Sequence, residues 1–159
     1  MEDAGLVDQG PLGDPRLTAW GVLVEGYSRV TARLQQDLQE ECGLPPTWFE
    51  VLLRLARTPG GRLRMTELAG QVSFTSGGFT RLADRLEAAG YLQREPCPTD
   101  RRAAFAVITD EGRSVVEEAA KVHLRGLQAY VLDHVAEQDL AAFARAARAV
   151  RDAQPPASG

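Results

Sequence analysis

The residues that form disulfides and metal centres are scarce in this chain of 159 residues. There are two cysteines and two histidines. Cys42 and Cys97 lie far apart in the sequence, and two cysteines in a chain of this length do not make a disulfide framework. His123 and His134 are eleven residues apart on one predicted helix, which separates them by about 16 Å, whereas metal ligands bind at about 2 Å. We therefore expect no metal site and no cofactor.

Long apolar segments are missing as well. No run approaches the roughly 18 apolar residues of a membrane span. The acidic N-terminus MEDAGLVDQGPLGDP lacks the basic and apolar regions of a signal peptide. With 44% hydrophobic and 25% charged residues, the chain is predicted to be globular, cytoplasmic and without a membrane partner. Residues 1–14 are expected to form a flexible arm and residues 153–159 a flexible tail.

Lysine is almost absent, and the other basic residues are concentrated in one region. Lys121 is the only lysine among 18 basic residues. The chain has a net charge of −4, which argues weakly against a nucleic-acid partner. However, the segment from Arg62 to Arg102 carries seven arginines and five acidic residues, a net of +2, which leaves −6 on the rest. A basic region on an acidic body favours an anionic partner, and the planar guanidinium of arginine binds phosphates and bases.

The apolar pattern predicts a mainly α-helical protein with one β-hairpin. Apolar residues recur at steps of three and four from Leu17 to Leu38, which indicates one long helix that ends before Gly43. Thr66 is the expected N-cap of the third helix. Two short strands are predicted for YLQREP and AAFAVIT. The helices are predicted over residues 15–42, 46–58, 63–72, 77–89, 110–134 and 137–152.

The third and fourth predicted helices form a helix-turn-helix pattern across the short break SFTS. In the fourth helix, apolar residues at i, i+3, i+4 and i+7 from Phe79 turn inward. The helix N-terminus can receive a phosphate through its free N–H groups and its dipole. Taken alone, the segment fits an ordinary amphipathic helix equally well. The residues left outward or at the N-terminus are Thr75, Ser76, Gly77, Gly78, Thr80, Arg81, Asp84 and Arg85.

A hairpin directly after a helix-turn-helix is the pattern of a winged helix. The stretch PCPTDRRAAFAVIT places Asp100, Arg101 and Arg102 at the predicted tip. Arginine is favoured in a narrow minor groove by the enhanced negative potential there. Asp100 can hold Arg102 or connect the tip to Arg81 or Arg85. Exposed guanidinium groups on an acidic protein are thus explained by a partner that is double-stranded DNA.

These segments resemble the DNA-binding core of the multiple-antibiotic-resistance (MarR) regulators. The resemblance is carried by TRLADRLEAAGYL, by the wing motif D-x-R at residues 100–102 and by ITDEG after it, and in helix order it extends from about Asp14 to Asp152. It implies a homodimer and repression that a ligand or an oxidant relieves. It also implies a helical dimerisation region over 15–44 and 110–152 and a DNA-binding lobe over 45–109. The implied DNA contacts are Ser76, Thr80, Arg81 and Arg85 in the recognition helix and Arg102 in the wing.

The resemblance further implies an effector pocket between the first, second and fifth helices. Trp20, Trp48 and His123 are the candidate lining residues, because each joins an apolar body to a polar tip that can orient a small aromatic or phenolic effector. Each of the three is also explained as a core or interface residue.

Other functions are compatible with parts of the pattern. A redox-responsive regulator can use Cys97, which is expected to be exposed near the wing tip, or Cys42, although two preceding glutamates disfavour its thiolate. A winged helix can also bind proteins, but that role does not require arginines at the tip. No Gly-rich phosphate loop, metal-ligand cluster or nucleophile motif is found, so an enzyme is not expected.

Overall fold

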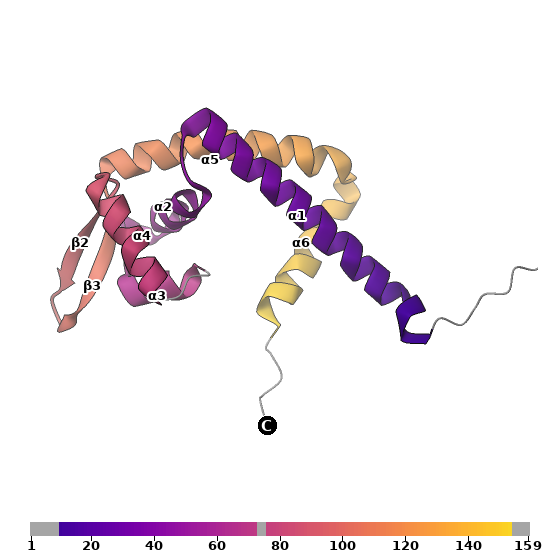
Figure 1. Cartoon of the computed structure of the whole chain (residues 1–159), viewed down its shortest axis with the longest axis horizontal. Helices are drawn as coiled ribbons and strands as arrows, with labels where there is room; N and C mark the ends of the chain where they lie inside the picture. The colour runs from indigo at the N-terminus through magenta and orange to yellow at the C-terminus, as the bar shows by residue number, and fades with distance from the viewer. Residues whose placement is uncertain (1–9, 73–75, 154–159) are drawn as a thin grey trace, which may run out of the picture.

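The computed structural model describes residues 10–72 and 76–153, of which residues 10, 76, 77, 101 and 102 are described by their backbone alone. The described chain is mainly α-helical with one small antiparallel sheet, as the sequence predicts (Figure 1). The elements are α1 (Pro15–Cys42), α2 (Pro46–Arg57), β1 (Arg62–Arg64), α3 (Met65–Gln71), α4 (Ser76–Ala88), β2 (Leu92–Cys97), β3 (Asp100–Ile108), α5 (Asp110–Tyr130) and α6 (Glu137–Asp152), with 3₁₀ turns at Gly10–Gly13, Pro59–Gly61 and Leu132–His134.

A lobe built from α2, α3, α4 and the sheet contains most of the buried core. Leu52, Leu55 and Leu68 are fully buried, and Leu82 and Leu86 of α4 are buried against them. Burying one such side chain contributes about 1.5–3 kcal/mol. This packing fixes which face of α4 is turned inward and therefore which face is left to solvent.

The sheet contains a third strand that the sequence pattern does not predict. The strand order is β1-β3-β2, and Leu63 of β1 pairs with Ala106 of β3. The predictions that Leu63 belongs to the third helix and that Thr66 is its N-cap are wrong, because Leu63 lies in β1, α3 begins at Met65 and its N-cap is Arg64. The Arg64 backbone N–H donates to the carboxylate of Glu67 at 3.4 Å, which satisfies one group at this helix start.

The buried residues of the long helix α1 lie in its C-terminal half, where it packs on α5. Leu34 and Leu38 are buried there. A Cβ on Gly126 of α5 would lie 2.5 Å from Leu34 Cδ2, so the glycine permits this close approach. The N-terminal half of α1 extends beyond α5 (Figure 1), and Leu17, Trp20, Val24 and Tyr27 are 54%, 59%, 43% and 70% exposed. Half of the predicted apolar stripe is therefore uncovered within one chain.

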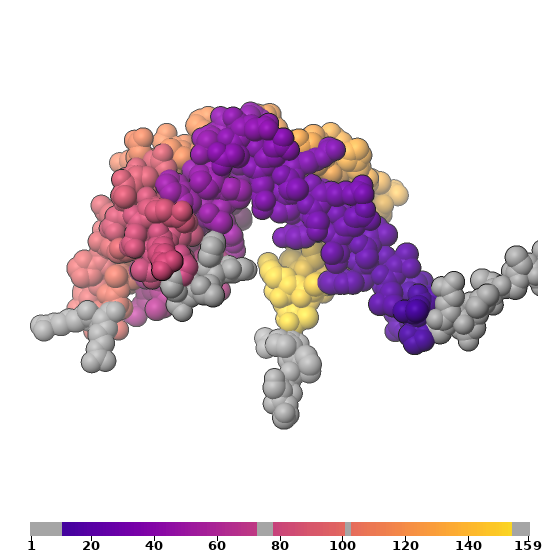
Figure 2. Space-filling view, in the orientation of Figure 1, coloured from indigo at the N-terminus to yellow at the C-terminus, as the bar shows by residue number. Residues whose placement is uncertain are grey.

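The C-terminal region turns back beneath α1. The prediction that the fifth helix continues to about His134 is wrong, because Val131 leaves the helical conformation with φ −128° and ψ −62°. A hydrogen bond from Gln128 to Asp133 spans the turn before α6. Figure 2 shows an arch, with the lobe on one side and α6 and the N-terminal half of α1 on the other. Within the described ranges, no helix is long and apolar enough to cross a membrane.

Candidate nucleic-acid interface

Helix α4 presents a polar outer face that is fixed by its buried inner face. Phe79, Leu82, Ala83 and Leu86 are all buried, as the sequence predicts. Gly78 is half-buried, and Ser76 starts the helix. Thr75 lies outside the described residues. The exposed residues of the outer face are Thr80, Arg81, Asp84 and Arg85.

Two guanidinium groups on this outer face have no acidic partner among the residues that the structure describes. Within residues 10–72 and 76–153, no ion pair or side-chain hydrogen bond is formed by Arg81 or Arg85. Most other arginines of the lobe are paired, for example Arg54 with Glu50 at 2.9 Å and Arg62 with Glu95 at 3.7 Å. An exposed unpaired guanidinium keeps its full charge and its fork of donors available for phosphates or base edges.

The wing lies beside α4 and points the same way as the start of that helix. β2 and β3 pair antiparallel, with a register shift between Pro96 and Cys97. Because α4 and β2 are joined by a short turn at Gly90, which has φ 79°, the C-terminal end of β2 lies at the end of the lobe where α4 begins (Figure 1). Asp100 is exposed at the start of β3, and the backbone of Arg101 and Arg102 continues that strand. The side chains of these two arginines lie outside the described part.

Arg94 of β2 forms ion pairs that join α4 to the wing. Its guanidinium binds Asp84 at 2.6 Å and Glu87 at 3.0 Å, and its backbone N–H donates to Glu87 at 3.2 Å. The sequence pattern does not predict this link. The i, i+3 spacing of the two acids is visible in the sequence, but the position of Arg94 opposite them depends on the turn at Gly90.

A second set of contacts supports the base of the wing. The Arg62 guanidinium lies 4.1 Å from the centre of the Phe105 ring, and that of Arg64 lies 5.8 Å from it. Arg62 and Glu95 lie on the two outer strands, so their ion pair spans the sheet over Phe105 of the central strand. These contacts stiffen the hairpin from both edges.

The two cysteines differ in how well they match the environment expected from the sequence. Cys97 is 6% exposed, so the expectation that it is exposed is wrong. Hydrogen bonds with the Thr99 side chain and backbone lower the pKa of the Cys97 thiol, and its Sγ lies 3.9 Å from Arg64 Nη2. Cys42 is half-buried, and burial, followed by the charge of Glu41, raises the pKa of its thiol.

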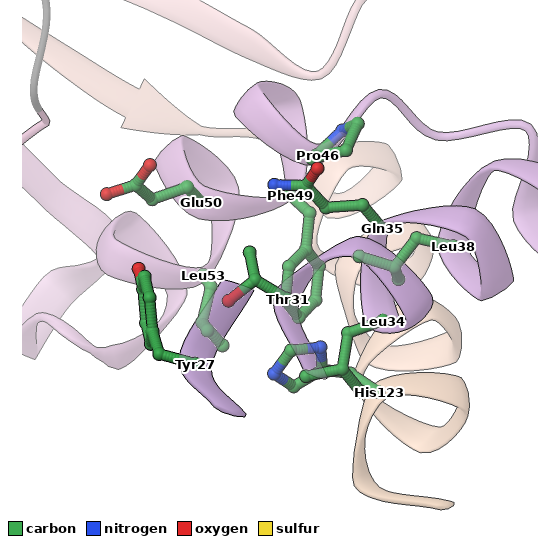
Figure 3. Close-up of a pocket in the computed structure, with 10 residues that line it drawn as sticks. All are labelled: Tyr27, Thr31, Leu34, Gln35, Leu38, Pro46, Phe49, Glu50, Leu53 and His123. Carbon is green, nitrogen blue, oxygen red and sulfur yellow. The ribbon is translucent and has the colours of Figure 1, made fainter. Parts of the chain in front are cut away.

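A cavity of about 340 Å³ opens between α1, α2 and α5 (Figure 3). It contains one of the three predicted pocket residues, His123. Trp20 does not line this cavity and is exposed, while Trp48 packs edge-on against Tyr91 with ring centres 5.9 Å apart. The structure thus does not bring the three predicted residues together. The lining residues are Tyr27, Thr31, Leu34, Gln35, Leu38, Pro46, Phe49, Glu50, Leu53 and His123.

His123 has one ring nitrogen without a hydrogen-bond partner. Its ring lies 5.0 Å from that of Phe49. In the described part of the chain, Nδ1 is buried and makes no hydrogen bond. Burial lowers the pKa of His123, so the ring is neutral at pH 7. A buried polar atom without a partner is uncommon and costs free energy until a partner is supplied.

The two helices, the outward face of α4 and the adjacent hairpin together define a winged helix-turn-helix protein. The family model described as "MarR family" matches residues 43–103. A Bacillus subtilis relative, the uncharacterized HTH-type transcriptional regulator YkoM, is 30% identical over 67% of this chain and 68% of its own. HTH-type transcriptional regulator MhqR of the same organism is 30% identical over 64% of this chain and 68% of its own.

A solved structure extends the similarity over nearly the whole chain. Sco3205 of Streptomyces coelicolor, a MarR family transcriptional regulator in complex with DNA, superimposes with a TM-score of 0.80 and 32% identity over 90% of this chain and 91% of its own. The present chain belongs to the MarR family of transcriptional regulators.

Proposed function

We propose that the protein is a homodimeric repressor that binds a pseudo-palindromic DNA operator and is released from it by a small molecule. The observation that carries the proposal is the pair of unpartnered guanidinium groups, Arg81 and Arg85, on the outer face of α4 next to the wing. No acidic residue of the described chain pairs with them. Binding to a polyanion therefore breaks no internal ion pair, and the free energy of binding is not reduced by such a loss.

The proposed DNA contacts follow from the arrangement of α4 and the wing, because the wing points the same way as the start of α4. The outer face of α4 enters the major groove, and the wing tip reaches the neighbouring minor groove. The start of α4 receives a phosphate. Asp100 positions the wing tip. The proposed contact residues are Thr75, Ser76, Gly78, Thr80, Arg81, Arg85, Asp100, Arg101 and Arg102.

Dimerisation is supported by the uncovered half of the apolar stripe on α1. Trp20 and Tyr27 are 59% and 70% exposed, and on α6 Phe143 and Val150 are 50% and 64% exposed. Monomeric proteins usually expose apolar side chains singly. Several large apolar side chains exposed together, as here, favour a protein interface. We propose the second copy of the chain as the partner, with residues 15–44 and 110–152 as the dimerisation region. A two-fold dimer presents two wings and requires half-sites about one helical turn apart.

Release by an effector is supported by the position of the α1–α2–α5 cavity. It lies where the proposed dimerisation helix α1 meets α2 of the lobe. A ligand shifts a conformational equilibrium only if it binds one conformation better than the other. A cavity between the two parts of the molecule can make that distinction, because its shape changes when they move.

A gel-shift assay with the upstream region of the protein's own gene tests the proposal. The protein should form a discrete complex that specific competitor DNA removes and unrelated DNA does not. The double variant Arg81→Ala/Arg85→Ala should lose the complex, while Lys121→Ala, which removes an exposed cation from α5, should retain it. Equal binding by the double variant and the wild type would refute the assignment of α4. Absence of any specific complex would favour a winged helix that binds proteins.

A further inference from the structure

The two unpaired arginines of α4 occupy different places on its outer face. The buried residues of the helix define the opposite face. With about 100° of rotation per residue, Arg81 lies about 30° from the direction that points straight outward, and Arg85 lies about 70° from it. Arg81 is also in the second turn of α4 and Arg85 in the third. Because the N-terminal residues of a recognition helix contact base edges, Arg81 is placed to reach into a groove and Arg85 to reach its phosphate border.

An acidic residue on the same face is held by the wing instead of by Arg81. Asp84 follows Arg81 by three residues, and opposite charges at that spacing attract each other on a helix. Its carboxylate is bound by Arg94 of β2, with Nη2 2.6 Å from Oδ1. Arg94 also binds Glu87 at 3.0 Å, which keeps its guanidinium on the β2 side of α4. Within the described ranges, Arg81 forms no ion pair although a carboxylate lies within one turn of it.

A planar guanidinium matches one base of the major groove. Guanine presents two acceptors there, O6 and N7, whereas each of the other bases presents at most one. Two parallel hydrogen bonds from one arginine therefore select guanine. A phosphate also accepts hydrogen bonds but carries no sequence information, and a lysine can bind it as a point charge. A base contact and a phosphate contact are thus distinguished by what a substitution does to sequence preference.

We propose that Arg81 reads a guanine in each half-site of the operator and that Arg85 binds a phosphate. The ion pair between Arg94 and Asp84 keeps Arg81 available, because it occupies the acid closest to Arg81 along α4. Guanine selectivity then depends on a wing residue that acts through another side chain. The inference rests on the proposed function, because it assigns roles within the same DNA-binding face.

Operators selected from a randomised DNA library provide the test of the base contact. Sequences bound by the wild type give a consensus, and 7-deazaguanine then replaces each consensus guanine of one half-site in turn. This base keeps its Watson–Crick pairing but lacks the N7 acceptor. Fluorescence anisotropy at fixed salt should show one position where the replacement costs the wild type at least about fivefold in affinity. At that position the Arg81→Ala variant should bind the normal and the modified operator equally.

Arg85 supplies the matched control, because it lies on the same helix and is likewise unpaired in the described part of the chain. Arg85→Ala should keep the consensus and the N7 effect. It should also bind all sequences more weakly, with the slope of log affinity against log salt concentration reduced by about 1 per subunit. Arg85→Lys should restore that slope, since a point charge suffices for a phosphate. Circular dichroism checks that each variant is folded.

A double variant tests the role of the ion pair. Arg94→Ala should reduce the N7 effect, because Asp84 is then free to pair with Arg81. Arg94→Ala/Asp84→Asn lacks the competing charge and should recover most of the effect. A purely mechanical link between α4 and the wing predicts no recovery, since the double variant lacks the ion pair as well.

The outcomes separate this inference from the proposed function. If no consensus is selected, the proposed function fails and the inference fails with it. If a consensus is selected but no guanine N7 depends on Arg81, or if the N7 effect depends on Arg85 instead, the inference is overturned and the proposed function stands. Equal N7 effects in Arg94→Ala and in the double variant overturn the role of the ion pair.

Discussion

Arg94 of β2 binds Asp84 of α4 with its Nη2 2.6 Å from Oδ1, and it holds Glu87 one turn further along the same helix. The recognition helix and the wing are thereby joined by side chains as well as by the turn at Gly90. A DNA-binding lobe must present both elements at a fixed separation, because the major and minor grooves are spaced by the duplex. Arg94 is therefore a positioning residue.

Replacing Arg94 should affect DNA binding more than folding. The pair is partly exposed, and such ion pairs contribute about 0–1 kcal/mol to stability. We expect Arg94→Ala to lower the free energy of unfolding by no more than about 1 kcal/mol and to weaken specific operator binding several-fold. Urea denaturation and fluorescence anisotropy measure the two quantities. The matched control is Arg125→Ala, which breaks the ion pair with Glu41 between α5 and α1 and should leave DNA affinity unchanged. An Arg94→Ala variant with wild-type operator affinity would contradict the positioning role.

Arg102 is expected to contribute directly to operator binding. As a minor-groove arginine in the wing, it should account for about 1–3 kcal/mol of the binding free energy. Arg102→Ala should also reduce the slope of log affinity against log salt concentration by about 1, because one phosphate-proximal cation is lost. Affinities are compared at equal salt, with Lys121→Ala as the charge-matched control. If Arg102→Ala binds the operator with the same affinity as the wild type, the proposed contact between the wing and DNA is wrong.

The uncovered face of α1 is expected to hold the dimer together. Trp20→Glu places a charge among exposed apolar residues that we assign to the interface, and desolvating that charge is costly. Multi-angle light scattering at micromolar concentration should show a dimer for the wild type and a shift to monomer for Trp20→Glu. Gln36→Glu introduces the same residue on the exposed polar side of α1 and should remain dimeric. A wild-type protein that is monomeric under these conditions would refute the dimer.

Stability should decrease in mild acid because of His123. Its folded-state pKa is lowered by burial, so between that pKa and the unfolded value of about 6.5 the unfolded chain binds more protons. Stability therefore rises with pH in this window and is lost as pH falls below about 6.5. The melting temperature is measured from pH 7.5 to pH 5.5 for the wild type and for His123→Phe. The variant should show a smaller decrease, and parallel curves for the two proteins would show that His123 does not titrate differently on folding.

Gly112 near the start of α5 has no room for a side chain. A Cβ there would lie 2.0 Å from the carbonyl oxygen of Tyr91, a backbone atom that cannot rotate away. Gly112→Ala should destabilise the protein by about 1–3 kcal/mol or more, as overpacking does. In contrast, Gly70→Ala in α3 meets nothing within 4 Å and should be neutral or stabilising by up to about 1 kcal/mol. Urea denaturation measures the free energy of unfolding of both variants. Equal values for Gly112→Ala and Gly70→Ala would contradict the prediction.

The end of α1, the start of α5 and the inward face of α4 could be read from the sequence. Gly43 ends α1 in the left-handed conformation with φ 61°, and the Thr109 hydroxyl accepts the Gly112 N–H at 3.0 Å to start α5. These signals are local, since a cap or an apolar repeat involves residues three or four positions apart. The winged helix-turn-helix was predictable for the same reason, because its elements follow one another along the chain.

The sequence by itself thus determined the order of most elements and the class of protein, whereas contacts between distant segments decided the rest. β1 has three residues, too few for a periodic pattern, and exists because Arg62–Arg64 finds its hydrogen-bond partners in β3, some forty positions later. Trp48 was assigned to a pocket but packs on Tyr91. Cys97 was expected to be exposed but is buried, with its Sγ 3.9 Å from Arg64 Nη2. Only the packing of α1 and α2 on α5 isolates the His123 nitrogen from solvent, because burial depends on which surfaces meet and not on which residues are neighbours in sequence.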